Sequence, residues 1–116
     1  MFFRQLLHEE RACLSYLVGC QTKGVCAVVD PQGRPEKYIG EASQHGMAIS
    51  HIFETHIHAD HVSGARELSS QTGSPIYLGP QADVEYAHIS AAEGQQIEVG
   101  NRRLRAHAGT YLPARG

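Results

Sequence analysis

The sequence has no tryptophan and few other aromatic residues, which together make up 7% of its 116 positions. A core must therefore be built mainly from Ile, Leu, Val and Ala. Neither sign of charge dominates, since 12 acidic residues stand against 10 basic ones and the formal net charge is −2. This balance excludes the strongly basic surface typical of nucleic-acid-binding and membrane-surface proteins. No apolar run approaches the roughly 20 residues that span a bilayer, so we expect one domain without such partners.

Cysteines are also scarce. Cys13, Cys20 and Cys26 are odd in number and none has the C-x-x-C spacing of a zinc or redox motif. The N-terminal segment becomes charged at Arg4, too early for the apolar core of a secretory signal. We therefore expect reduced thiols in a cytoplasmic protein.

The apolar pattern predicts an α/β fold. The run at residues 25–29 is continuously apolar, as in a strand buried on both faces, and it stops at Asp30-Pro31. Pro35 near its start and Gly46 after its end bound a predicted helix at residues 35–45. We expect further strands at 2–7, 13–18, 49–54 and 75–78, a helix at 62–71, helical turns at 82–88, and a hairpin joining 96–99 to 104–106.

Histidine is the residue type in excess, with eight copies. Four potential metal ligands fall within six positions, directly after the predicted strand at 49–54: His56, His58, Asp60 and His61. Residues two apart on extended chain point the same way, so His56 and His58 can reach one metal ion. Asp60 and His61, on the turn into the next helix, can reach a neighbouring point. Imidazole and carboxylate groups suit zinc, iron or manganese, and we expect one or two such ions, zinc foremost.

The other five histidines are isolated from one another along the chain, and we interpret them as ordinary surface or core residues. They are His8, His45, His51, His88 and His107. The alternative for the cluster, a surface turn that binds nothing, fits a single histidine better than four ligands at one strand-to-helix junction.

The Thr-His-x-His-x-Asp-His sequence at residues 55–61, between a strand and a helix, resembles the metal loop of the metallo-β-lactamase superfamily. The flanking sequence resembles the glyoxalase II and persulfide dioxygenase branch, and above all the members fused to a rhodanese domain. The similar segments are Phe-Arg-Gln at 3–5, Ser-Tyr-Leu-Val at 15–18, Val-Val-Asp-Pro-Gln at 28–32, His-Ala-Asp-His-Val-Ser-Gly-Ala at 58–65 and Thr-Gly-Ser-Pro-Ile-Tyr-Leu-Gly at 72–79. The resemblance runs over residues 1–106.

This resemblance implies a role for each ligand. His56 and His58 would bind the first metal, and Asp60 and His61 the second where there is one. His56 also matches a ligand of the single iron in the dioxygenases. Asp30 matches a residue beneath the loop, where it would hold loop backbone or an imidazole N–H. The alternative for Asp30 is a plain Asp-Pro turn.

The resemblance covers only the first half of the family's αβ/βα sandwich. The second half supplies a histidine in a Thr-Pro-Gly-His-Thr segment and a further aspartate, and neither occurs here. Codons that can encode residues 107–111 also encode Thr-Pro-Gly-His-Thr after a shift of one base. We therefore interpret residues 107–116 as a frameshifted tail outside the family and the chain as a natural truncation, in which His107 is no equivalent of the missing ligand.

A half-sandwich leaves one face of its sheet open to water, which the apolar strand at residues 25–29 does not tolerate. We therefore expect a homodimer that imitates the complete sandwich. Its approximate two-fold symmetry brings two metal loops to one edge, so that the partner's loop replaces the missing ligands.

Three functions remain open from the sequence. The first is a hydrolase of esters, thioesters or phosphoesters in small molecules, in which a metal-bound hydroxide attacks and Asp60 accepts a proton. The second is a persulfide dioxygenase-like iron oxygenase, which requires two histidines and one carboxylate around the iron. The third is a non-catalytic, metal-binding remnant, since a catalytic zinc site normally takes three protein ligands.

Overall fold

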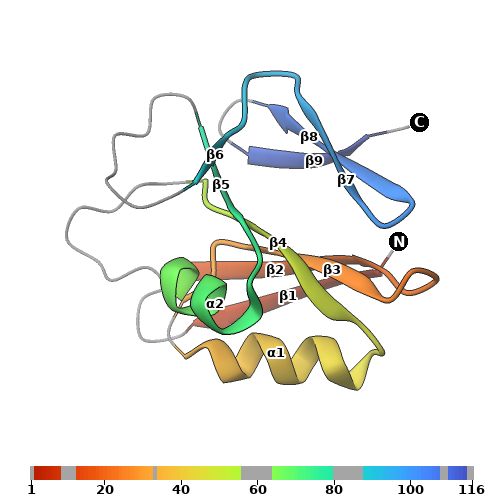
Figure 1. Cartoon of the computed structure of the whole chain (residues 1–116), viewed down its shortest axis with the longest axis vertical. Coiled ribbons are helices and arrows are strands. Elements are labelled where there is room, and N and C mark those ends of the chain that lie inside the picture. The colour runs from red at the N-terminus through yellow and green to blue at the C-terminus, as the bar shows by residue number, and fades with distance from the viewer. Residues whose placement is uncertain are drawn as a thin grey trace.

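The computed structural model describes residues 2–8, 13–32, 34–55, 64–79, 88–107 and 110–114. Within these ranges the chain contains both strands and helices, in line with the α/β prediction (Figure 1). In chain order the elements are β1 Phe2–His8, β2 Cys13–Cys20, β3 Val25–Val29, α1 Pro35–Gln44, β4 Ala48–Phe53, α2 Gly64–Thr72, β5 Ile76–Leu78, β6 Ile89–Ser90, β7 Gln96–Val99, β8 Arg102–His107 and β9 Thr110–Ala114.

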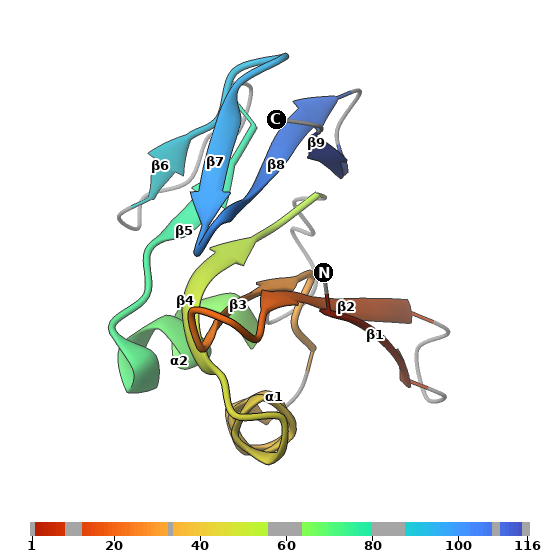
Figure 2. The same cartoon turned by 90° about the vertical axis from the view of Figure 1, so that its right-hand side faces the viewer.

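The strands form two sheets. The larger sheet has the order β1-β2-β3-β4-β5-β6, antiparallel from β1 to β3 and parallel from β3 to β6. The smaller sheet is the antiparallel set β7-β8-β9. Both helices lie on one side of the larger sheet and the smaller sheet lies on the other (Figures 1 and 2). Because β3, β4 and β5 are parallel, their C-terminal ends lie at one edge of the larger sheet. Open α/β sheets commonly bind ligands at this edge.

The helix-covered face carries one apolar cluster. Cys26 and Val28 of β3 point toward the helices, where Tyr38 of α1 and Leu68 of α2 are fully buried against them. The full cluster is Leu17, Cys26, Val28, Tyr38, Ala42, Met47, Ile49, Ile52, Ala65, Leu68, Ile76 and Leu78. Helix α1 starts at Pro35 and is followed by Gly46 in the left-handed region, as the Pro and Gly positions predicted.

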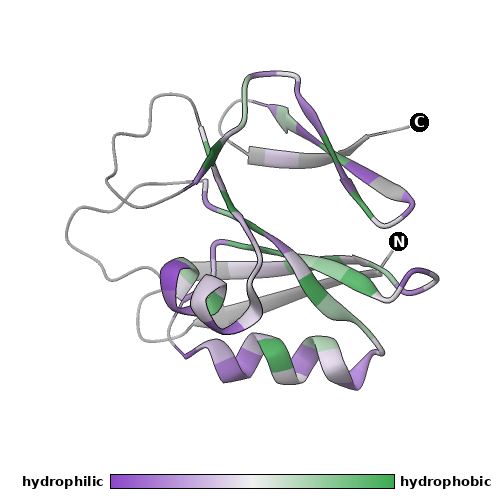
Figure 3. Cartoon of the chain, viewed as in Figure 1, coloured by the Kyte–Doolittle hydropathy of each residue, from purple (hydrophilic) through white to green (hydrophobic). Residues whose placement is uncertain are grey.

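The opposite face of the larger sheet is covered by the smaller sheet of the same chain. Ala27 and Val29 of β3 point to this side, because successive residues of a strand alternate. The second cluster comprises Val18, Ala27, Val29, Phe53, Ala91, Ile97, Val99, Leu104 and Ala106. The expectation of an open apolar face is therefore wrong: β3 is buried on both sides within one chain. Hydrophobic residues concentrate along β3 and β4 in the middle of the fold (Figure 3).

Two edge strands were not expected from the sequence. Strand β6 has only two residues, both exposed, so it carries no apolar alternation that could predict it. Strand β9 contains Pro113, a residue type that argues against a central strand but is tolerated at an edge. The helical turns expected at 82–88 fall outside the described residues except for His88, which lies in no helix.

Strand β9 belongs to the segment interpreted as a tail. It pairs with β8 in the register Ala106↔Tyr111, and the centroid of the Tyr111 ring lies 4.3 Å from that of the Phe53 ring at the end of β4. This part of the tail is thus packed into the small sheet, whereas the domain boundary at residue 107 and its frameshift origin stay predictions.

We expect Tyr111→Ala to lower the free energy of unfolding by about 2 kcal/mol, because it removes a half-buried ring from the space between the sheets. Tyr111→Phe keeps the ring and is expected to change that free energy little. Urea denaturation of the two variants beside the wild type checks this. Equal stability of the alanine variant and the wild type would mean that β9 is not packed in solution.

The two described cysteine side chains fit the predicted reduced state. Cys20 and Cys26 are buried and free of disulfides, and burial raises the pKa of the Cys26 thiol to about 12. The thiol of Cys20 donates a hydrogen bond to Asn101 Oδ1 over 2.7 Å. No helix within the described ranges is long and apolar enough to cross a membrane.

Candidate metal centre

The four predicted ligands His56, His58, Asp60 and His61 fall outside the described residues. What the structure describes is the frame on either side of them: the end of β4 with Thr55, and the start of α2 at Gly64. Among the described residues, no group of three His, Cys, Asp or Glu side chains lies close enough to hold a metal ion. In the sequence the predicted ligands stand between Thr55 and Gly64, and their assignment stays a prediction.

Asp30 is the one predicted site residue that the structure describes. It follows β3, next to the end of β4, since Val29 pairs with Phe53 in parallel register. Its Oδ1 accepts a hydrogen bond from the Thr55 backbone N–H over 2.7 Å, and its Oδ2 accepts another from the Thr55 hydroxyl. The Asp30 carboxylate thus holds the residue that directly precedes His56.

The backbone of Asp30 is held in an uncommon conformation. Its φ of 55° lies in the left-handed region, which aspartate tolerates better than most residues. The Asp30 N–H donates to the Phe53 carbonyl over 2.7 Å. Both the conformation and this hydrogen bond aim the carboxylate at Thr55. A plain Asp-Pro turn would require neither the hydrogen bond to Phe53 nor the one from Thr55.

The other side of the loop is attached to the same turn. The N–H of Gly64, the first residue of α2, donates to the carbonyl of Pro31 over 3.2 Å. Residues 30 and 31 thus contact the chain on both sides of the predicted ligands.

Glu54 was not singled out from the sequence. It lies between β4 and Thr55, is 5% exposed, and its N–H donates to the Tyr77 carbonyl over 3.1 Å. Burial above all, and then the charges of Asp30 and Glu54, raises the pKa of Tyr111 to about 12. Two carboxylates therefore lie at this edge of the sheet, where their charge favours a cation. The signal in the sequence was an acidic residue between an apolar strand and a histidine cluster.

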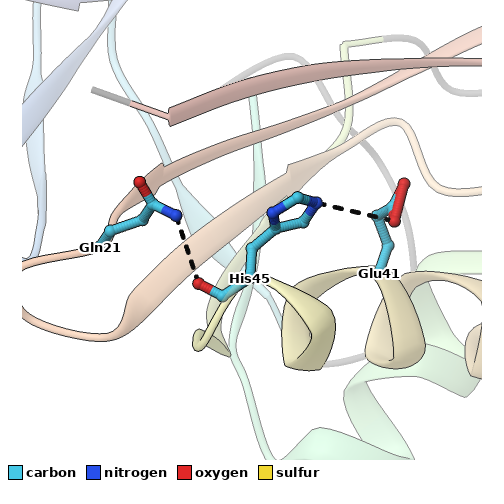
Figure 4. Close-up of polar contacts among 3 residues, drawn as sticks. All are labelled: Gln21, Glu41 and His45. Carbon is cyan, nitrogen blue, oxygen red and sulfur yellow. Dashed lines mark hydrogen bonds and ion pairs between the residues drawn. The ribbon is translucent and has the colours of Figure 1, made fainter.

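Three of the isolated histidines, His45, His51 and His107, have described contacts with neighbouring residues. His45 caps the C-terminus of α1, where its Nε2 lies 4.0 Å from a Glu41 carboxylate oxygen and its carbonyl accepts a hydrogen bond from the Gln21 amide over 3.4 Å (Figure 4). His107 Nδ1 lies 3.0 Å from Glu93 Oε2. These contacts fit the interpretation of both as ordinary structural histidines.

His51 of β4 is half-buried beside two aromatic rings that also contact each other. Its ring centroid lies 5.5 Å from that of Tyr77 and 6.1 Å from that of Phe53, and Nδ1 lies 2.7 Å from Ser50 Oγ. Burial lowers the pKa of His51 below its ordinary value of 6.5. The neutral ring therefore contributes stability that is fully present above the unfolded-state pKa and is lost as the pH falls through the lower, folded-state pKa.

We expect His51→Phe, which keeps an aromatic ring, to remove the loss of stability that protonation of His51 causes at low pH. The difference in unfolding free energy between wild type and variant should shift in favour of the variant as the pH drops below 6.5. Urea denaturation of the metal-free proteins at a series of pH values measures that difference. A difference that does not change with pH would contradict the expectation.

Comparison with known proteins gives a consistent result. Residues 8–108 match the family model described as metallo-beta-lactamase superfamily. A hydroxyacylglutathione hydrolase from Rhodospirillum rubrum is 34% identical over 92 residues, which are 78% of this chain and 36% of that protein. The chain spans about a third of the length of the curated hydroxyacylglutathione hydrolases that it matches.

Two solved structures share the fold over nearly the whole chain. A metallo-beta-lactamase from Staphylococcus aureus superposes with a TM-score of 0.83 at 32% identity, covering 92% of this chain and 34% of that one. ETHE1 from Myxococcus xanthus superposes with a TM-score of 0.80 at 24% identity, covering 90% and 47%. In each case the similarity covers less than half of the larger protein.

Proposed function

Since this chain belongs to the metallo-β-lactamase superfamily, as its sequence motif predicted, we propose that it is a metal-dependent hydrolase of ester-type bonds in small molecules. The substrate class we put first is a hydroxyacylglutathione thioester, after the hydrolases that share its sequence. Other esters and phosphoesters come second. We propose zinc as the first metal to test, because two or three imidazoles with a carboxylate suit it.

The main support for the proposal is that the residues on both sides of the predicted ligands are hydrogen-bonded to one turn. Four residues with metal-binding side chains lie between Thr55 and Gly64, and both of these residues are hydrogen-bonded to the Asp30-Pro31 turn. A loop held at both ends keeps its ligands near one another before any metal binds. Such preorganisation lowers the entropy that binding must offset.

The donor set fits a divalent metal. His56 and His58 would hold a first ion, and Asp60 and His61 a second. When bound, the metal polarises the substrate oxygen and makes water a better nucleophile near neutral pH. Asp60 would serve as the proton acceptor for the attacking water if it did not bind metal firmly. Asp30 keeps Thr55, and with it the start of the loop, in place.

The test is a metal count followed by an assay. The purified chain is loaded with Zn²⁺, the metal per chain is measured by mass spectrometry, and thiol release from a hydroxyacylglutathione is followed with and without a chelator. The proposal requires at least one tightly bound metal per two chains and chelator-sensitive thiol release. Less metal than this would favour a non-catalytic remnant. Full metal without hydrolysis, but with oxygen uptake on glutathione persulfide by the iron-loaded protein, would favour the oxygenase.

A homodimer with a shared site stays a proposal, and only one of the two original arguments still supports it. The smaller sheet covers the face that was expected to be open, so burial no longer calls for a partner. What supports a dimer is the number of ligands, because His56 and His58 supply two of the three that a catalytic zinc usually takes. Light scattering of the metal-loaded chain tests it, and a monomeric mass with full zinc and full activity would exclude a shared site.

A further inference from the structure

In the turn that follows β3, every backbone polar group of residues 30–32 has a partner. The Asp30 N–H donates to Phe53, and the Pro31 carbonyl accepts from Gly64. The Asp30 carbonyl and both backbone groups of Gln32 remain, and they bond to two side chains from elsewhere in the chain. This segment, residues 30–32, is the same one that holds both ends of the metal loop.

The two side chains are Ser15 of β2 and Tyr38 of α1. Ser15 Oγ donates to the Asp30 carbonyl over 2.7 Å, and the two hydroxyl oxygens lie 2.9 Å apart. The Gln32 N–H donates to the Tyr38 hydroxyl oxygen over 2.7 Å. Both side chains are fully buried, so water cannot replace either hydroxyl without entering the core.

The protons of this pair can be assigned. Because Ser15 gives its hydroxyl proton to the Asp30 carbonyl, Tyr38 must be the donor between the two hydroxyls. The Tyr38 proton is therefore shared between Ser15 Oγ and the Gln32 carbonyl, which lies 3.0 Å away. Burial is the main reason that the pKa of Tyr38 is raised, and the phenol keeps its proton through the neutral range. The acceptors of both hydroxyl protons are thus fixed by the surrounding groups.

We propose that Ser15 and Tyr38 are positioning residues that set the metal affinity of the loop by fixing residues 30–32. This proposal rests on the metal site put forward above. Both side chains act through the turn, by way of the Asp30 carboxylate, which accepts from Thr55, and the Pro31 carbonyl, which accepts from Gly64. Loss of either hydroxyl removes a hydrogen bond to the backbone of the turn, so that both ends of the loop gain freedom together.

The chain offers a matched control for Ser15. Ser74 is also a buried serine, 4% exposed against 0%, and its Oγ donates to the Ile49 carbonyl over 2.8 Å. Ser15→Ala and Ser74→Ala therefore each remove one buried hydroxyl that donates to a backbone carbonyl. Only the first touches the turn that holds the loop. Tyr38→Phe removes the second hydroxyl of the pair and keeps its ring.

Two measurements separate this proposal from the function it rests on. Zinc affinity, from competition with a chromophoric chelator, should weaken about three- to tenfold in Ser15→Ala and Tyr38→Phe, below the roughly 10- to 100-fold typical of a direct partner of a ligand. It should stay unchanged in Ser74→Ala. Hydrogen–deuterium exchange of peptides covering residues 54–64 in the metal-free protein should be faster in the first two variants only.

The two measurements distinguish failure of the proposed function from failure of this proposal. If the wild type binds no zinc, the proposed function fails, while exchange still tests the coupling of the pair to the loop. If the wild type binds zinc and Ser15→Ala behaves like Ser74→Ala in both measurements, the pair does not position the loop. Should either variant fail to fold, the other carries the test, because each removes one hydroxyl of the same pair.

Discussion

His58→Ala is expected to abolish stoichiometric zinc binding and to lower kcat/KM for thioester hydrolysis about 10³-fold. The substitution removes one of the two imidazoles assigned to the first metal, and so the group that polarises the substrate is lost with it. Removing a single charge-stabilising donor from an active site costs about 10²–10³ in rate. Loss of a metal ligand belongs at the upper end of that range.

The matched control is His45→Ala. His45 is also a histidine, but it caps α1 beside Glu41 and lies in a part of the chain that has no role in the proposed site. It should keep zinc content and activity near the wild-type values. Metal counting and the thiol-release assay on the two variants side by side give the answer. Equal activity of His58→Ala and His45→Ala would remove the histidine cluster from the mechanism.

Asp30→Gly is expected to have the second-largest effect, weakening zinc binding about 10- to 100-fold, as is typical when a residue supporting metal ligands is lost. Glycine accepts the positive φ of this position, so the backbone of the turn need not change. What is lost is the carboxylate that accepts from both the N–H and the hydroxyl of Thr55. The start of the loop is then free to move.

Asp30→Asn isolates the hydrogen bonds from the charge. Asparagine also tolerates the left-handed region, and its carbonyl oxygen can accept from the Thr55 N–H while its amide donates to the Thr55 hydroxyl. We expect it to lie between wild type and Asp30→Gly in chelator competition. If Asp30→Asn were as weak as Asp30→Gly, the negative charge at the turn would be the decisive property; if Asp30→Gly bound zinc as the wild type does, Asp30 would be only a turn residue.

The elements that frame the site were largely predictable, because their signals are local. Asp30-Pro31 ends a continuously apolar strand, and Pro35 and Gly46 mark the two ends of α1. The edge strands β6 and β9 were not predictable in this way. Strand β6 has only two residues and β9 contains a proline. What makes them strands is pairing with β5 and β8.

The residues that support the candidate site also differ in whether a local sequence pattern reveals them. Asp30 was found from the sequence because it lies in a recognisable motif. Ser15 and Tyr38 carry no motif, and they meet beneath the turn although they are 23 positions apart. Glu54 was adjacent to the motif, yet its burial depends on the strands packed around it.

The sequence by itself determined the superfamily, the α/β class and the identity and spacing of the loop's potential ligands, since these depend on residue type and on neighbours along the chain. Only the tertiary structure decided how the apolar faces are covered. The hairpin of β7 and β8, with β9 beside it, folds back onto the larger sheet and buries the face that the sequence had suggested was open. It also decided that one turn holds both ends of the loop, because such contacts depend on side-chain packing between distant segments, which no local pattern records.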